Sequence, residues 1–100
     1  MRFSKNGNEV TAVVEGKLDR TSSPEFEKSI GEVLTDDVRS VVIDLAPCIY
    51  ISSAGLRVIL ALEKRMSKCG GKLVVRNVPE LVLEVFTETG LDEILTLERV

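Results

Sequence analysis

Residues 41–60 read VVIDLAPCIYISSAGLRVIL, and this stretch decides the fold. Its opening letters, VVIDL, form a short β-branched run that predicts a strand buried on both faces, as in a parallel sheet covered by helices. Its end starts an amphipathic helix, whose apolar positions recur at steps of three and four: Ile59, Leu62, Met66 and Cys69. Gly70 and Gly71 end that helix, and KLVV follows as another strand. The strand, helix and strand predict a right-handed parallel crossover.

The flanking segments extend this pattern in both directions. Asn6-Gly7 predicts a tight hairpin turn near the N-terminus, because this dipeptide readily takes positive φ angles. Ser23 is expected to cap a helix with Pro24 as its first residue, and the apolar stripe of that helix is Phe26, Ile30, Val33 and Leu34.

Residues 79–91, PELVLEVFTETGL, predict a third helix that ends at Gly90. Its apolar side is expected to carry Leu81, Val82, Val85 and Phe86. A last strand is placed near residues 95–97. We therefore expect one α/β domain over residues 1–100, with a mixed sheet of four to five strands, helices packed mainly on one face and the order ββαβαβαβ.

Composition excludes several classes of function. The longest apolar run is the five residues 58–62, against roughly 20 for a membrane span, and the N-terminus lacks the pattern of a signal peptide, so a cytoplasmic protein without a membrane segment is expected. The formal charge of −3 argues against direct nucleic-acid binding. Two cysteines 21 positions apart and no histidine make a metal site or disulfide framework unexpected.

The serine pair at 52 and 53 allows three interpretations. One of the serines can cap the following helix through its hydroxyl. A catalytic nucleophile would need a base within reach, and the chain has no histidine for a Ser-His-Asp arrangement, so no enzyme activity is expected. The third is a phosphorylation switch: if Ser52 caps, Ser53 falls in the first turn, where the helix dipole and Arg57 at i+4 can receive a phosphate.

The stretch 41–60, together with VEGKLDRTSSPEFE upstream, resembles the STAS domain of anti-sigma factor antagonists over nearly the whole chain. The resemblance implies partner switching. The unphosphorylated protein binds a serine-kinase anti-sigma factor and so frees the sigma factor, phosphorylation by that kinase abolishes binding, and a serine phosphatase resets the switch. It implies no cofactor, since nucleotide and magnesium would belong to the kinase.

The resemblance also suggests roles for residues. The phosphoacceptor matches Ser53, two residues before Gly55. Ser52, which stands where relatives often have aspartate, is the fallback. Asp19 matches a family aspartate beside the acceptor and is the candidate for kinase recognition. Partner-binding residues are therefore expected among Asp19, Tyr50, Ser52, Ser53, Gly55 and Arg57.

Structural interpretations stand beside several of these roles. Asp19 can equally be a turn residue whose carboxylate binds its own backbone, and Asp44 is interpreted as structural. Tyr50 would suit a binding surface if it is exposed. The basic stripe of Arg57, Lys64 and Lys68 is either a solvated face or complementary to an acidic partner. The alternative function is a non-switching interaction subunit of a membrane transporter or lipid-transport ATPase, because the same domain occurs in those systems.

Overall fold

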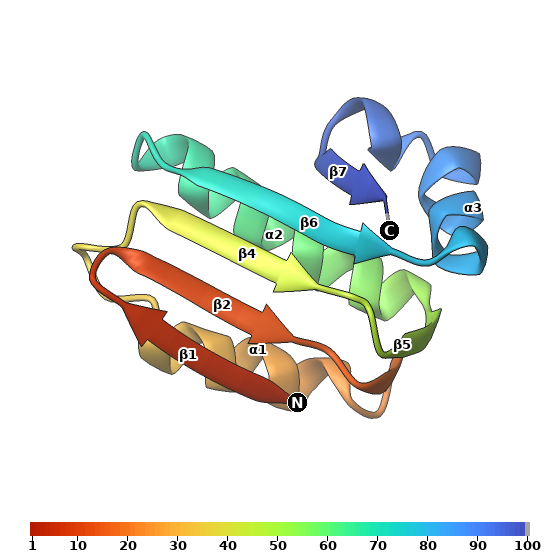
Figure 1. Ribbon diagram of the computed structural model, residues 1–100, viewed down its shortest axis with the longest axis horizontal. Coiled ribbons are helices and arrows are strands. Elements are labelled where there is room, and N and C mark those ends of the chain that lie inside the picture. The colour runs from red at the N-terminus through yellow and green to blue at the C-terminus, as the bar shows by residue number, and fades with distance from the viewer. Residues whose placement is uncertain (100) are drawn as a thin grey trace.

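The computed structural model describes residues 1–99 and shows a five-stranded mixed sheet (Figure 1). The strands lie in the order β1-β2-β4-β6-β7; β1 is antiparallel to β2, and the other neighbours are parallel. Their bounds are Arg2–Asn6 for β1, Glu9–Val13 for β2, Ser40–Asp44 for β4, Lys72–Val78 for β6 and Thr96–Arg99 for β7. The expected fold class is therefore confirmed.

The hairpin that opens the chain is confirmed with a small change in its turn. Asn6 pairs with Glu9, so the two-residue loop is Gly7 and Asn8, and only Gly7 takes a positive φ, of 64°. Glycine adopts that angle without the steric cost that a Cβ brings.

The central strand is buried as its sequence predicts. Val41, Val42 and Ile43 of β4 are all buried, and β4 is the middle strand of the sheet. Val41 and Ile43 join the core between the sheet and the helices, whereas Val42 alternates to the other face, which no helix covers, and is still only 4% exposed.

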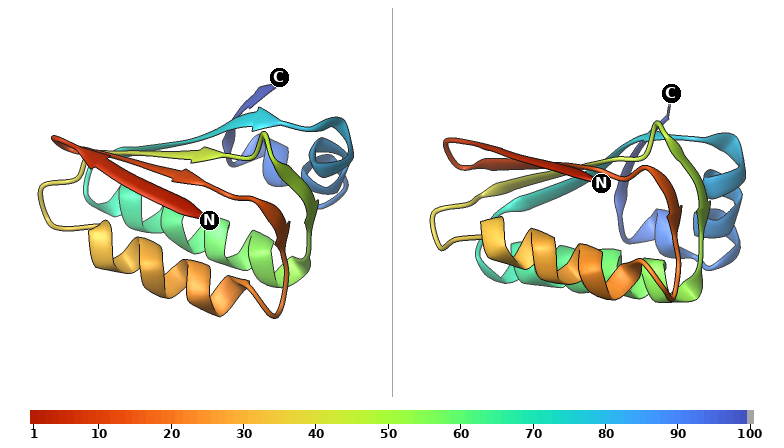
Figure 2. Two further views of the ribbon diagram at one scale, coloured as in Figure 1. Left: turned by 60° about the horizontal axis from the view of Figure 1, so that its bottom comes forward. Right: turned by 90° about the horizontal axis from the view of Figure 1, so that it is seen from below.

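Two long helices cover one face of the sheet, as expected (Figure 2). They are α1 at Ser23–Val33 and α2 at Ser53–Lys68, and they lie side by side. A third helix, α3 at Glu80–Glu88, stands at the end of the sheet where β6 finishes, and a 3₁₀ turn at Leu91–Glu93 leads into β7. The core lies between the sheet and these helices.

Three details of the helices differ from the sequence prediction. The N-cap of α1 is Ser22 rather than Ser23, because Ser23 is already helical. Cys69 lies one residue past the end of α2 and is exposed. Leu81 is 71% exposed, because the buried residues of α3 are Val82 and Phe86, so the buried stripe of this short helix is narrower than its apolar residues suggest.

Two short strands were not expected. Gly16–Leu18 (β3) and Cys48–Ile51 (β5) pair in parallel as a separate two-stranded sheet. In β5 the end residues are buried and the two middle residues are exposed, so the segment lacks the alternation by which a strand is recognised. This small sheet extends from the ends of β2 and β4 toward α2 and fixes the loops that carry Asp19 and the serines.

Candidate functional site

The serine pair and Asp19 come together through the pairing of β3 with β5. Leu18 is the register partner of Ile51, and the next backbone N–H, that of Ser52, donates to the carbonyl oxygen of Leu18 at 2.9 Å. Asp19 directly follows Leu18. The start of α2 and the loop before α1 are therefore joined by main-chain hydrogen bonds, which fix the site independently of any surface side chain.

Ser52 occupies the N-cap position of α2 but does not cap the helix with its hydroxyl. Its backbone is extended (φ −100°, ψ 174°), and its carbonyl accepts the first helical bond from the N–H of Leu56 at 2.9 Å. The side-chain oxygen makes no cap hydrogen bond, is buried, and has no partner among the described residues. The predicted position of the cap is confirmed, and the predicted capping bond of Ser52 is wrong.

Ser53 is the first residue of α2, and its side chain is exposed. No acidic residue stands in the first turn, so the free N–H groups and the positive end of the helix dipole face solvent without a neighbouring carboxylate on the helix. Arg57, one turn further on, is exposed as well. The site therefore presents an accessible hydroxyl at the positive end of a helix dipole, and its phosphorylation stays a prediction.

Gly55 is buried against the small sheet, and no other residue fits there. A Cβ at this position would lie 2.6 Å from the carbonyl oxygen of Leu18, 2.9 Å from Leu18 Cγ and 3.0 Å from Ile51 Cγ1. The glycine lets the first turn of α2 approach β3 and β5 closely. Gly55 was expected among the partner-binding residues. Because it is buried, it can affect binding only by fixing the position of Ser53.

Asp19 is a turn residue held by hydrogen bonds. Its Oδ1 accepts from the backbone N–H groups of Ser22 at 3.1 Å and Thr21 at 3.0 Å, and from the Ser22 hydroxyl at 3.3 Å. The hydrogen bond from the backbone of Ser22 is the largest cause that lowers the pKa of this carboxyl below its ordinary value. The other oxygen, Oδ2, accepts no hydrogen bond from the described residues. The turn role is thus confirmed, and kinase recognition stays a prediction.

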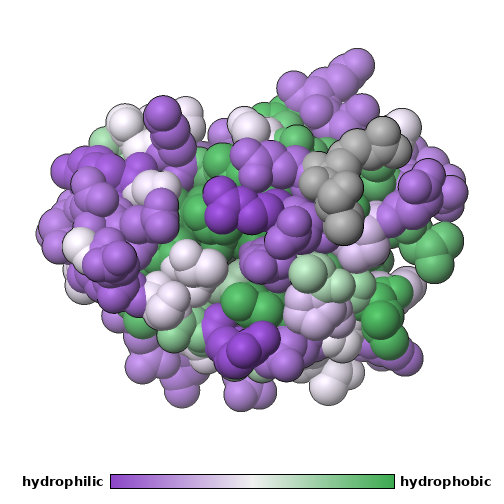
Figure 3. All heavy atoms as spheres, viewed as in Figure 1, coloured by the Kyte–Doolittle hydropathy of each residue, from purple (hydrophilic) through white to green (hydrophobic). Residues whose placement is uncertain are grey.

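Apolar side chains are exposed beside the serines. Tyr50 is 50% exposed and Ile49 67%, because both middle residues of β5 point outward. α3 packs against β5 and adds the exposed Leu81. Figure 3 shows apolar surface at this end of the molecule, where Figure 1 places β5 and α3. The exposure of Tyr50 meets the condition set for a binding residue.

Asp44 has a structural role. Its Oδ1 accepts from the backbone N–H of Ala46 at 2.9 Å and from Asn77 Nδ2 at 3.2 Å. Asn77 has a positive φ of 56°. Asp44 therefore ties the end of β4 to the end of β6, as its position at a strand end suggested.

Across residues 1–99, no three His, Cys, Asp or Glu side chains gather where they could hold a metal ion. No helix in that part of the chain has the length and apolarity that a membrane crossing needs.

Sequence reasoning missed a hollow between α1 and α2, directly beside the serines. Its volume is about 380 Å³, and Ala54 and Arg57 line it on the α2 side, with Ser23 and Pro24 on the α1 side and Arg20 at the end. Ser23 is 3% exposed, and its Oγ has no hydrogen-bond partner among the described residues. The nearest sequence signal was the small residues at 54 and 61, which leave space between packed helices.

Known proteins match this chain along most of its length. A family profile described as "Mlab, STAS domain" matches residues 1–97. BtrV of Bordetella bronchiseptica, a candidate anti-sigma factor antagonist, is 34% identical over 79 residues, which are 79% of this chain and 68% of BtrV. The anti-sigma-B factor antagonist of Bacillus subtilis is 28% identical over 95 residues, 93% of this chain and 84% of that protein.

The fold agrees with these relatives. The crystal structure of an anti-sigma factor antagonist from Mycobacterium paratuberculosis superposes with a TM-score of 0.86 at 25% identity, over 99% of this chain and 84% of that one. The sequence relatives of this chain are thus named as antagonists. The chain itself has a buried glycine after an exposed serine, the β3–β5 pairing and this order of strands. The protein belongs to the STAS domain family of anti-sigma factor antagonists.

Proposed function

We propose that this protein antagonises an anti-sigma factor by partner switching. The unphosphorylated chain binds a serine-kinase anti-sigma factor and frees the sigma factor. That kinase phosphorylates Ser53, the complex separates, and a serine phosphatase restores the binding form. The observation that carries the proposal is the exposed hydroxyl of Ser53 at the first residue of α2, held in place by the main chain of Leu18 and by Gly55.

Accessibility favours Ser53 over Ser52 as the phosphoacceptor. A kinase must reach the hydroxyl oxygen in line with the transferred phosphoryl group. The Ser52 oxygen is buried at the start of the helix, so transfer of a phosphoryl group to it would require the first turn of α2 to open. The Ser53 side chain needs no such movement.

The fold can accept the phosphate without unfolding. A phosphoserine carries about −1.5 to −2 charge, and the N-terminus of a helix stabilises negative charge. Arg57 at i+4 is near enough on the helix surface for a charge-assisted contact. Phosphorylation therefore changes the docking surface and leaves the core as it is, which suits a switch that has to be reversed.

Asp19 is proposed to contact the kinase through its free carboxylate oxygen. The turn bonds occupy Oδ1 and fix the orientation of the carboxyl group, so Oδ2 is presented to a partner without further ordering. A contact made by a pre-organised group loses less conformational entropy on binding. The alternative of a non-switching transporter subunit is not favoured, because the relatives described above are named as antagonists.

The test is phosphorylation by the cognate kinase. A gene for a small serine kinase beside the gene of this protein would identify that kinase. Incubation with the kinase and ATP, followed by mass spectrometry, is expected to place one phosphate on Ser53. Ser53→Ala should abolish the reaction, and Ser52→Ala should leave it intact. Phosphate on neither serine would refute the proposal, and phosphate on Ser52 alone would refute the assignment of the acceptor.

A further inference from the structure

A line of unpaired positive charge runs along α2 away from Ser53. Arg57, Lys64, Arg65 and Lys68 lie on α2, Arg20 lies in the loop before α1, and all five are exposed. The guanidinium of Arg65 also donates to the carbonyl oxygen of Leu34 at 2.8 Å. We call this surface the basic groove. No ion pair among the described residues involves any of the five, although the chain as a whole carries a net charge of −3. This surface therefore carries five of the 13 basic residues of the chain without a neutralising ion pair from the described part of the chain.

The groove has a recessed apolar floor. The hollow next to Ser53 is lined by Pro24, Ala54 and Val58 between the two arginines, and it meets a second hollow, beside Lys64 and Lys68, at Ala61. Small side chains on the floor leave space for the aliphatic side chains of an incoming segment. Glu27 is the single acid among the residues lining the first hollow.

We propose that the basic groove binds an acidic, amphipathic segment of the anti-sigma factor kinase. This inference rests on the proposed function and deepens it, because it explains how one phosphate releases the partner. Ser53 directly precedes Ala54 at the mouth of the groove. A phosphate there competes with the segment for Arg57 and repels its carboxylates.

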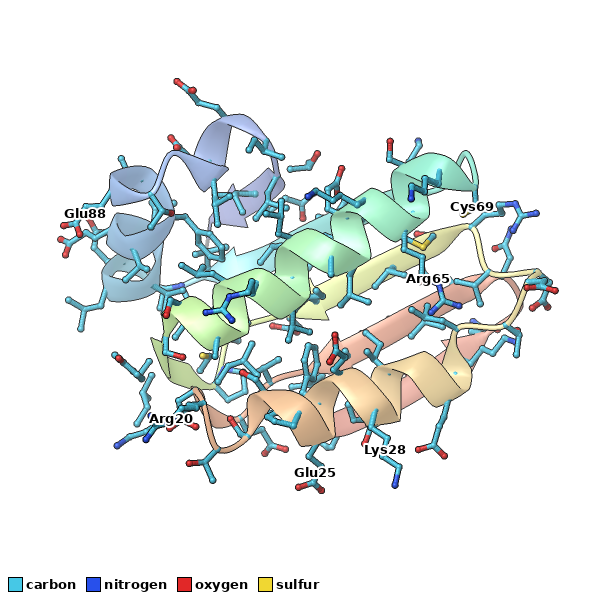
Figure 4. All side chains as sticks on the ribbon, turned by 180° about the vertical axis from the view of Figure 1, so that it is seen from behind. Arg20, Glu25, Lys28, Arg65, Cys69 and Glu88 are labelled. Atoms are coloured by element: carbon cyan, nitrogen blue, oxygen red, sulfur yellow. The ribbon has the colours of Figure 1, made fainter. Side chains whose placement is uncertain are left out.

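Lys64 provides the test because it is far from the acceptor. It lies eleven residues beyond Ser53, roughly 16 Å along the helix, so it contacts neither the serine nor a phosphate on it. Lys28 on α1 is the matched control: it is also exposed, and Figure 4 shows it on the side of α1 that faces away from α2. Lys64→Glu and Lys28→Glu change the net charge equally.

Binding of the full chain to the cognate kinase is measured by surface plasmon resonance at low and physiological salt. Lys64→Glu is expected to reduce the association rate at least ~5-fold at low salt and to flatten its salt dependence, whereas Lys28→Glu changes it less than ~2-fold, because charge at an interface acts mainly on association. Both substitutions are exposed, so circular dichroism should show unchanged folding.

The outcomes separate the two proposals. If the wild-type chain binds the kinase and is phosphorylated but Lys64→Glu behaves like Lys28→Glu, the groove proposal is overturned and the proposed function stands. If Lys64→Glu alters self-association in sedimentation and leaves kinase binding unchanged, the groove belongs to a second copy of this chain, and the proposal is again overturned. If the wild-type chain does not bind the kinase, both proposals fail together.

Discussion

Replacing Gly55 by alanine tests the packing on which the site depends. The added methyl would lie 2.6 Å from the Leu18 carbonyl oxygen, whereas ordinary contact begins at 3.4 Å, so α2 and β3 must separate by about 0.8 Å. The obstructing atom belongs to the backbone and is itself bonded to the N–H of Ser52, so it cannot rotate away. Overpacking of this kind costs about 1–3 kcal/mol. Replacing a glycine inside a helix by alanine stabilises the helix by up to about 1 kcal/mol, which offsets part of this cost.

We therefore expect Gly55→Ala to lower the free energy of unfolding by about 1–2 kcal/mol, or the melting temperature by about 4–16 °C. Urea unfolding followed by circular dichroism measures the change. Gly31→Ala is the matched control, because it makes the same substitution in α1 where nothing lies within 4 Å, and it should raise stability by about 0.5–1 kcal/mol. A Gly55→Ala protein as stable as Gly31→Ala would refute the close-approach argument.

Further predictions concern the serines, the aspartate and the cysteines. Ser53→Asp should weaken kinase binding by at least about 1.4 kcal/mol, or tenfold, in a titration, and Ser53→Ala should bind and stay bound. Ser52→Ala should leave the urea midpoint unchanged or raise it, although losing a bonded serine cap costs about 1 kcal/mol, since its oxygen is buried and unpaired. Asp19 has a lowered pKa, so its stabilising effect is present above the ordinary value of 3.8 and is lost as pH falls through the folded-state pKa. The urea midpoint of Asp19→Asn should therefore change less than that of the wild type between pH 5 and about 3. Exposed Cys69 should react quickly with a disulfide reagent, whereas burial hides Cys48 and raises the pKa of its thiol, so only one fast-reacting thiol is expected.

The large elements of the fold could be predicted from the sequence because their patterns are local. The β-branched run at 41–43 indicates a strand in the middle of a sheet, where all three side chains are buried, and the helix of residues 53–68 repeats its apolar positions over several turns. Where a helix buries only a narrow stripe, as α3 does, periodicity overstates the core, and Leu81 was misplaced for that reason.

The geometry of the site was less accessible to sequence reasoning. Strands of three and four residues are too short to show a period, and the pairing of Leu18 with Ile51 joins segments more than thirty residues apart. The proximity of Asp19 to the serines was therefore implied by resemblance alone. The hydroxyl of Ser52 is unbonded although the extended backbone of this residue is the usual geometry of an N-cap, so the missing bond could not be predicted from its position before the helix.

The contact between Leu18 and the start of α2 bears on how such a protein can diversify. Because a backbone hydrogen bond and a buried glycine set the position of Ser53, the exposed neighbours Tyr50 and Arg57 take no part in holding it. Substitutions at those two positions can therefore leave the position of the Ser53 hydroxyl unchanged. A few surface substitutions are thus enough to stop one copy of such a protein from binding the kinase of another copy in the same genome. Each substitution changes binding specificity and leaves the fold unchanged.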